Sequence, residues 1–149
     1  QDADAVVAGF DRKFHYEKLR KAMRILNEGG KLYLCSNENI FRTSSGERPN
    51  QGPFNESLKR FADEQQIELV GKPSEAFRKS FKEYFTYIPT SSMFIGDRLE
   101  DVETGNKLGM RTGVVMSGET SREELAKAQG DREPHVGLTN LNRLKRNIL

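Results

Sequence analysis

The sequence predicts an α/β fold with a mainly parallel sheet and flanking helices. Short apolar runs alternate along the chain with segments in which apolar residues recur at helical spacing. Turns rich in Gly, Ser and Asn separate the two kinds of segment, and this alternation is typical of parallel strands joined by helices. The chain has 149 residues, enough for one compact domain or two small ones.

The first half of the chain begins with an apolar run at residues 5–10, which predicts a buried strand. Apolar residues at helical spacing then predict a helix over 16–26, and Gly29-Gly30 follows where a C-cap is expected. A second buried strand, with Cys35 in the core, is predicted over 31–35. The segment 41–53 is rich in Ser, Gly, Pro and Asn and is expected to be a loop.

The rest of the chain continues the alternation of helices and strands. Ser121 and Glu124 have the spacing of a capping box at the start of a helix. The expected elements are, in order, a helix over 53–65, a strand-like run over 67–70, helices over 75–84 and 99–108 with a strand over 92–95 between them, a strand over 111–116, a helix over 121–129, a short strand over 136–138 and a helix over 141–148.

Composition and charge give no reason to expect a nucleic acid or an anionic membrane as a partner. The 24 basic and 22 acidic residues leave a formal net charge of only +2. No apolar run approaches the roughly 20 residues that a membrane span needs. Cys35 is the single cysteine and cannot form an intrachain disulfide, so a reducing compartment such as the cytoplasm is expected.

Two carboxylates follow the strand expected over 92–95. Gly96-Asp97 ends the apolar run, and Asp101 comes four residues later. In an open α/β sheet, ligands bind at the carboxyl ends of strands, and carboxylate oxygens suit Mg²⁺. The alternative is that Gly96-Asp97 only starts a turn and that Asp97 caps the next helix. Lys72 follows another strand-like run, and its ammonium could hold a phosphate.

Several motifs occur in the order and spacing of a known family. They are residues 5–19, Ser36-Asn37, Gly71-Lys72-Pro73-Ser74, Gly96-Asp97-Arg98-Leu99-Glu100-Asp101, residues 109–112 and residues 114–118. With them the chain resembles the haloacid dehalogenase-like (HAD) superfamily of hydrolases over nearly its whole length. The similarity is to the branch with a large α/β cap, which includes p-nitrophenyl phosphatases and phosphoglycolate phosphatases. By this resemblance, residues 1–70 are part of the cap and residues 71–149 are the C-terminal half of the HAD-like core.

The resemblance implies a Mg²⁺-dependent phosphatase that hydrolyses small phosphomonoesters. Lys72 would contact the phosphate and the nucleophile, and Asp97 would be a Mg²⁺ ligand. Asp101 would support the metal site directly or through water. Asn37 lies in a loop of the cap, which in this branch helps to select the substrate.

The sequence departs from the family at the catalytic nucleophile. The family's nucleophile lies in an Asp-x-Asp-Gly-Thr motif that follows the first core strand. Asp2-Ala3-Asp4 has the spacing of the two acids, but no strand precedes it and no Gly-Thr follows it. In addition, Asp101 directly follows Glu100, where the branch usually has one more residue between them. No nucleophile is therefore identified in this chain, which is expected to be a fragment that is inactive alone.

Two other interpretations stay open. One is a non-catalytic HAD-like homologue that binds a ligand or a partner, because the missing nucleophile motif fits it equally well. The other is a phosphoacceptor domain of flavodoxin type, which is disfavoured because Asp97 lies late in the chain. Loss of half a core would expose a sheet edge. The chain is therefore expected to form a homo-oligomer or to associate with a missing N-terminal half of the core.

Overall fold

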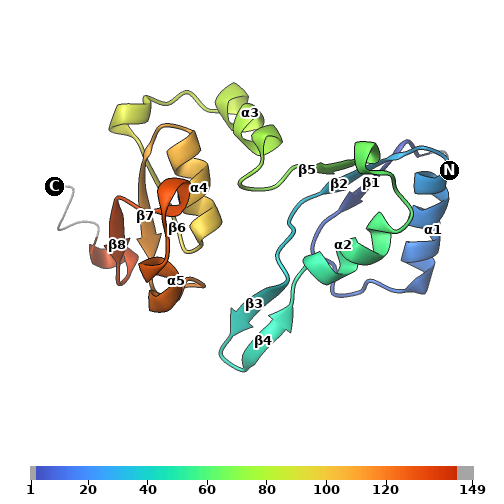
Figure 1. Ribbon diagram of the computed structural model, residues 1–149, viewed down its shortest axis with the longest axis horizontal. Helices are drawn as coiled ribbons and strands as arrows, with labels where there is room; N and C mark the ends of the chain where they lie inside the picture. The colour runs from blue at the N-terminus through green and yellow to red at the C-terminus, as the bar shows by residue number, and fades with distance from the viewer. Residues whose placement is uncertain (1–2, 144–149) are drawn as a thin grey trace. The chain divides into compact units, whose positions relative to one another are not determined.

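The computed structural model describes residues 3–143 and divides the chain into two compact units, Gln1–Gly71 and Lys72–Leu149 (Figure 1). Each unit contains a three-stranded sheet whose neighbouring strands are parallel. The mixed α/β class with mainly parallel sheets and flanking helices is thus confirmed. No helix among residues 3–143 is long and apolar enough to cross a bilayer.

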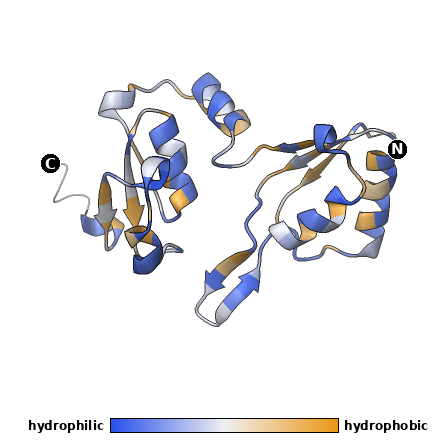
Figure 2. Ribbon diagram, viewed as in Figure 1, coloured by the Kyte–Doolittle hydropathy of each residue, from blue (hydrophilic) through white to orange (hydrophobic). Residues whose placement is uncertain are grey.

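The sheet of the first unit has the strand order β1-β2-β5. Its strands are β1 (Ala5–Ala8), β2 (Lys31–Leu34) and β5 (Ile67–Leu69), and its helices are α1 (Tyr16–Asn27) and α2 (Gly52–Lys59). Apolar residues from the strands and from one side of each helix form the core (Figure 2). The buried members of this core are Ala8, Ala22, Leu26, Leu32, Leu34 and Leu58.

The expectations for Cys35 and for residues 41–53 are wrong. The segment expected to be a loop contains an antiparallel hairpin of β3 (Ile40–Thr43) and β4 (Gly46–Pro49). All four residues of β4 are exposed, so this strand has no apolar alternation by which the sequence could reveal it. Cys35 is exposed, not part of the core, because β2 ends one residue before it.

The helix expected over 53–65 is also shorter than predicted. It ends at Lys59, and a separate 3₁₀ turn follows at Glu64–Gln66. Asp63 and Gln66 form a capping box at this turn, which starts a new element where the sequence suggested a continuous helix. The Gln66 amide also donates to the carbonyls of Leu26 and Gly30, which ties the turn to the end of α1.

The second unit has the strand order β6-β7-β8. Its strands are β6 (Met93–Gly96), β7 (Arg111–Val115) and β8 (Val136–Leu138). Its helices are α3 (Glu75–Tyr84), α4 (Leu99–Lys107) and α5 (Arg122–Ala126), with short 3₁₀ turns at Pro89–Ser91, Gly130–Arg132 and Leu141–Arg143. The part of the expected last helix over 144–148 lies outside the described residues.

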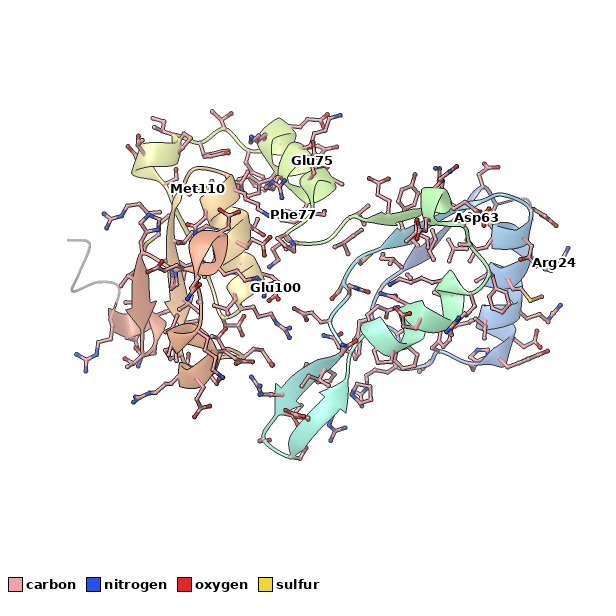
Figure 3. The ribbon with its side chains drawn as sticks, viewed as in Figure 1. Arg24, Asp63, Glu75, Phe77, Glu100 and Met110 are labelled. Atoms are coloured by element: carbon pink, nitrogen blue, oxygen red, sulfur yellow. The ribbon has the colours of Figure 1, made fainter. Side chains whose placement is uncertain are left out.

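Packing in the second unit places α4 against the β6-β7 pair. Val102 of α4 and Val114 of β7 are fully buried between them. An aromatic contact joins α3 to the same sheet, because the ring centroid of Phe81 lies 6.0 Å from that of Phe94. Phe77 projects from α3 one turn before Phe81, and its ring stacks on that of Phe81 (Figure 3). The predicted capping box of Ser121 and Glu124 is confirmed at the start of α5.

Candidate active site

Asp97 lies at the carboxyl end of β6, in the short connection to α4. Strand β6 consists of three apolar residues and Gly96, and it pairs with β7 so that Gly96 lies opposite Val114. Helix α4 begins at Leu99, so only Asp97 and Arg98 separate strand and helix. The sequence therefore predicted correctly that Asp97 follows a strand of a parallel sheet, where such folds bind ligands.

Asp101 lies in the first turn of α4 and folds back over the end of β6. Its Oδ2 accepts a hydrogen bond from the Arg98 N–H at 3.1 Å, and the residue is 5% exposed. A Cβ built on Gly96 would lie 2.1 Å from this Oδ2, so only glycine leaves room for the carboxylate here. The glycine before Asp97 is thus explained by packing against Asp101.

Lys72 reaches this carboxylate from the start of the second unit. Its Nζ lies 2.5 Å from Oδ1 of Asp101, and the side chain of Lys72 remains 41% exposed. Each oxygen of Asp101 consequently has one protein donor. The ammonium is held in place by a buried carboxylate, while part of the Lys72 side chain stays exposed.

The Asp97 carboxylate has a different environment. Among residues 3–143, no hydrogen bond or ion pair engages its oxygens, whereas its main-chain carbonyl accepts two. Both come from Thr120, whose N–H and Oγ1 lie 2.9 and 2.8 Å from that carbonyl. No motif in the sequence singles out Thr120. Its only signal is its position shortly after β7, the strand that neighbours β6.

Asn37 belongs to the first unit and lies just beyond β2. Its Oδ1 accepts hydrogen bonds from Asn55 Nδ2 at 3.3 Å and from Lys59 Nζ at 3.4 Å. Asn55 is fully buried and also donates to the Ser36 carbonyl at 2.7 Å. The structure thus places the amide oxygen of Asn37 in a network that joins its loop to α2.

A metal ion at this edge would find only part of a ligand set in the described residues. Nowhere in residues 3–143 do three or more His, Cys, Asp or Glu side chains gather closely enough to hold one. The free carboxylate of Asp97 nevertheless fits Mg²⁺, which prefers oxygen ligands and keeps waters and phosphate oxygens in its octahedral shell. Asp101 is less suited to direct binding because Lys72 and Arg98 already engage it.

A model of the HAD-hydrolase-like family matches residues 69–144. Chronophin from Bos taurus is 32% identical over 138 residues, which cover 88% of this chain and 46% of chronophin. Glycerol-3-phosphate phosphatase from Gallus gallus is 30% identical over 125 residues, which cover 81% of this chain and 40% of that protein.

A solved structure of 4-nitrophenylphosphatase from Thermotoga maritima aligns with the whole chain. The TM-score is 0.83 and the sequence identity 26%, and the alignment covers 57% of that protein. Because 46% and 40% of the two curated relatives are matched, the chain spans about half the length of these proteins or less.

Proposed function

The chain belongs to the HAD-hydrolase-like family, and we propose that it is part of a Mg²⁺-dependent phosphatase that hydrolyses small phosphomonoesters. Similarity to a chronophin, a glycerol-3-phosphate phosphatase and a 4-nitrophenylphosphatase supports phosphatase chemistry. In this proposal, residues 1–70 form part of a cap that selects the substrate, with Asn37 in a substrate-facing loop. Residues 71–149 form the C-terminal half of the catalytic core.

The contact between Lys72 and Asp101, beside Asp97 at the end of β6, carries the proposal. A phosphatase must bind a dianionic phosphate and stabilise the charge that develops on it. The ammonium of Lys72 is fixed at 2.5 Å from a buried carboxylate, yet the Lys72 side chain is 41% exposed. It can therefore donate to a phosphate oxygen from a fixed position, which is what orientation of the substrate requires.

The two carboxylates would have different roles toward Mg²⁺. Asp97 would be the direct ligand because its oxygens are not otherwise engaged within the described residues. Asp101 would act through water or at the edge of the metal site while it positions Lys72. A bound Mg²⁺ neutralises negative charge on the phosphoryl group during transfer. The remaining ligands would be waters, the phosphate and groups outside this sequence.

The nucleophile would also come from outside these 149 residues. Carboxylate catalysis in this family needs the Asp-x-Asp-Gly-Thr motif, which this sequence does not contain. We expect the isolated chain not to turn over phosphate esters. Edge strand β6 would then pair with the absent half of the core or with a second copy. A reducing compartment such as the cytoplasm suits the exposed Cys35.

The test is hydrolysis of 4-nitrophenyl phosphate with Mg²⁺ by the complete protein that the gene encodes and by the 149-residue chain. The complete protein should be active, and Asp97→Asn or Lys72→Met should lower its kcat/KM by at least about 100-fold. Asp131→Asn is the matched control because Asp131 is an exposed acid outside this site. Activity of the complete protein that survives Asp97→Asn would refute the assigned site.

The same experiment distinguishes the proposed phosphatase from the alternative, non-catalytic function. A complete protein that binds phosphate esters but never hydrolyses them would indicate a non-catalytic HAD-like homologue. Mg²⁺-dependent hydrolysis by the 149-residue chain without an added partner, abolished by Asp97→Ala, would refute the proposal that the nucleophile lies elsewhere.

A further inference from the structure

The loop between β7 and α5 contacts the Asp97-Arg98 connection through three successive residues. Gly118 lies against the Asp97 side chain, Glu119 Oε1 lies 3.9 Å from Arg98 Nη2, and Thr120 binds the Asp97 carbonyl. We infer that this loop sets the direction of the Asp97 carboxylate, with Gly118 and Thr120 as positioning residues. The inference rests on the proposed function, in which Asp97 is a Mg²⁺ ligand.

Gly118 limits where the Asp97 side chain can lie. A Cβ built on Gly118 would be 2.2 Å from Asp97 Cβ and 2.3 Å from Oδ2, far closer than such atoms approach. The main chain of the loop therefore lies directly against the carboxylate. Any side chain at position 118 would force Asp97 to turn away or the loop to withdraw. The glycine serves this close approach, because the three atoms nearest to the added Cβ are all in the Asp97 side chain.

Thr120 holds the main chain of Asp97. The residue is 6% exposed, and both its N–H and its hydroxyl donate to the one carbonyl of Asp97. This carbonyl lies between the end of β6 and the start of α4, where neither the sheet nor the helix would fix its direction. Thr120 therefore supplies the constraint that regular secondary structure does not supply at this position.

Both polar groups of the peptide between Asp97 and Arg98 are thus fixed by specific partners. Thr120 holds its carbonyl, and Oδ2 of Asp101 accepts from its N–H at 3.1 Å. These hydrogen bonds limit rotation of the planar peptide, and Gly118 limits where the Asp97 side chain can lie. Because Asp101 also binds Lys72, the loop and the Lys72–Asp101 pair hold the same peptide from opposite sides.

Loss of the Thr120 hydroxyl should remove one of the two donors to the Asp97 carbonyl, loosen the peptide and let the Asp97 carboxylate adopt more than one orientation. Groups that orient a metal ligand typically alter metal affinity by 10–100-fold when they are removed. Thr120→Val should therefore raise the Kd for Mn²⁺, used as a probe for the Mg²⁺ site, by about 10-fold. Thr120→Ser keeps the hydroxyl and should restore the wild-type value.

The experiment measures the χ1 rotamer populations of Asp97 by three-bond NMR couplings, together with the Kd for Mn²⁺, in the 149-residue chain. Wild type should show one dominant rotamer, Thr120→Val a mixture, and Thr120→Ser the wild-type pattern. Thr104→Val is the matched control because it removes a buried hydroxyl that donates to the Glu100 carbonyl at 2.6 Å. That control should leave the Asp97 rotamer unchanged.

The two readouts separate the inference from the proposed function. An unchanged Asp97 rotamer in Thr120→Val overturns the positioning role, whatever the metal affinity. A Kd for Mn²⁺ that is the same in Asp97→Ala as in the wild-type chain argues against the proposed metal role of Asp97, and the rotamer comparison still decides the inference. If Thr120→Val does not fold, Gly118→Ala is measured in its place. That variant must shift the Asp97 rotamer if the inference is correct.

Discussion

The Nζ of Lys72 lies 2.5 Å from Oδ1 of Asp101, although the two residues are 29 positions apart in the sequence. This contact joins the first residue of the second unit to the first turn of α4. Asp101 is buried, so this ammonium and the Arg98 N–H supply the hydrogen bonds that its carboxylate would otherwise receive from water. The pair therefore stabilises the fold of the second unit as well as the candidate site.

Replacement of Lys72 by Met should destabilise the second unit. The change leaves a buried carboxylate without its cation, and because Lys72 is partly exposed we expect a loss of about 1–3 kcal/mol in the free energy of unfolding. Amide hydrogen exchange in β6 and β7 measures this loss within the second unit.

Lys18→Met is the matched control for Lys72→Met. Lys18 Nζ also lies 2.5 Å from a carboxylate, that of Asp11, but both side chains are well exposed. An exposed ion pair contributes about 0–1 kcal/mol, so this change should have little effect. Equal losses of stability in the two units would contradict the prediction, because they would show that burial of Asp101 does not make its ion pair more stabilising than an exposed one.

Gly96→Ala should disrupt the site through Asp101. The new methyl group would lie 2.1–2.3 Å from atoms of the Asp101 side chain, which must then leave its place over the strand end. Overpacking of this kind typically costs 1–3 kcal/mol, and loss of the Lys72 contact adds to it. Gly137→Ala in β8 is the control, because its methyl group would meet Leu125 at an ordinary 3.4 Å. Thermal unfolding measures the stability of both variants, and equal losses of stability would contradict the prediction.

Local sequence patterns predicted those elements whose capping residues and apolar spacing lie within the element or next to it. The helix expected over 75–84 has the observed bounds, since Ser74 caps its start and apolar residues repeat along one side. The β3-β4 hairpin was missed because its stability comes from pairing between exposed, largely polar strands. Cys35 was misplaced because an apolar run does not show at which residue a strand ends.

In the candidate site too, the sequence predicted the residues of a local motif but not the residue that acts through a distant contact. Asp97 and Asp101 were found because both belong to one short motif after an apolar strand. The role of Thr120 depends on a hydrogen bond to a residue 23 positions earlier, which only the pairing of β6 with β7 makes possible. Side-chain contacts across neighbouring strands are not visible in one sequence, so such positioning residues need a structure.

Asn55→Leu should destabilise the first unit. Asn55 is fully buried, donates to Ser36 and Asn37, and accepts from Gln51 Nε2 at 3.0 Å. Leucine would leave the buried Gln51 amide without its acceptor and the half-buried Ser36 carbonyl without its donor, at a cost of about 2 kcal/mol or more. Hydrogen exchange in β2 measures the loss. Asn27→Leu, at an exposed position in α1, should change stability by less than about 0.5 kcal/mol, and a similar loss there would contradict the argument.

The last prediction concerns acid stability and depends on Glu103 of α4. Burial alone would raise the pKa of its carboxyl, but hydrogen bonds from Lys107 at 2.6 Å and Arg132 at 3.0 Å outweigh burial and lower the pKa below its usual value. A carboxyl with a lowered pKa in the folded state stabilises the protein above its unfolded-state pKa. That contribution is lost as the pH falls through the lower folded-state pKa.

Replacement of Glu103 by Gln should therefore remove part of the pH dependence. At neutral pH the variant should be less stable than wild type, and the two stabilities should converge as the pH falls below the usual glutamate range. Urea denaturation of both proteins between pH 7 and about pH 3 measures this convergence. Glu123→Gln, in the first turn of α5, is the control and should follow wild type. A constant difference between Glu103→Gln and wild type at all pH values would show that packing, not charge, makes Glu103 stabilising.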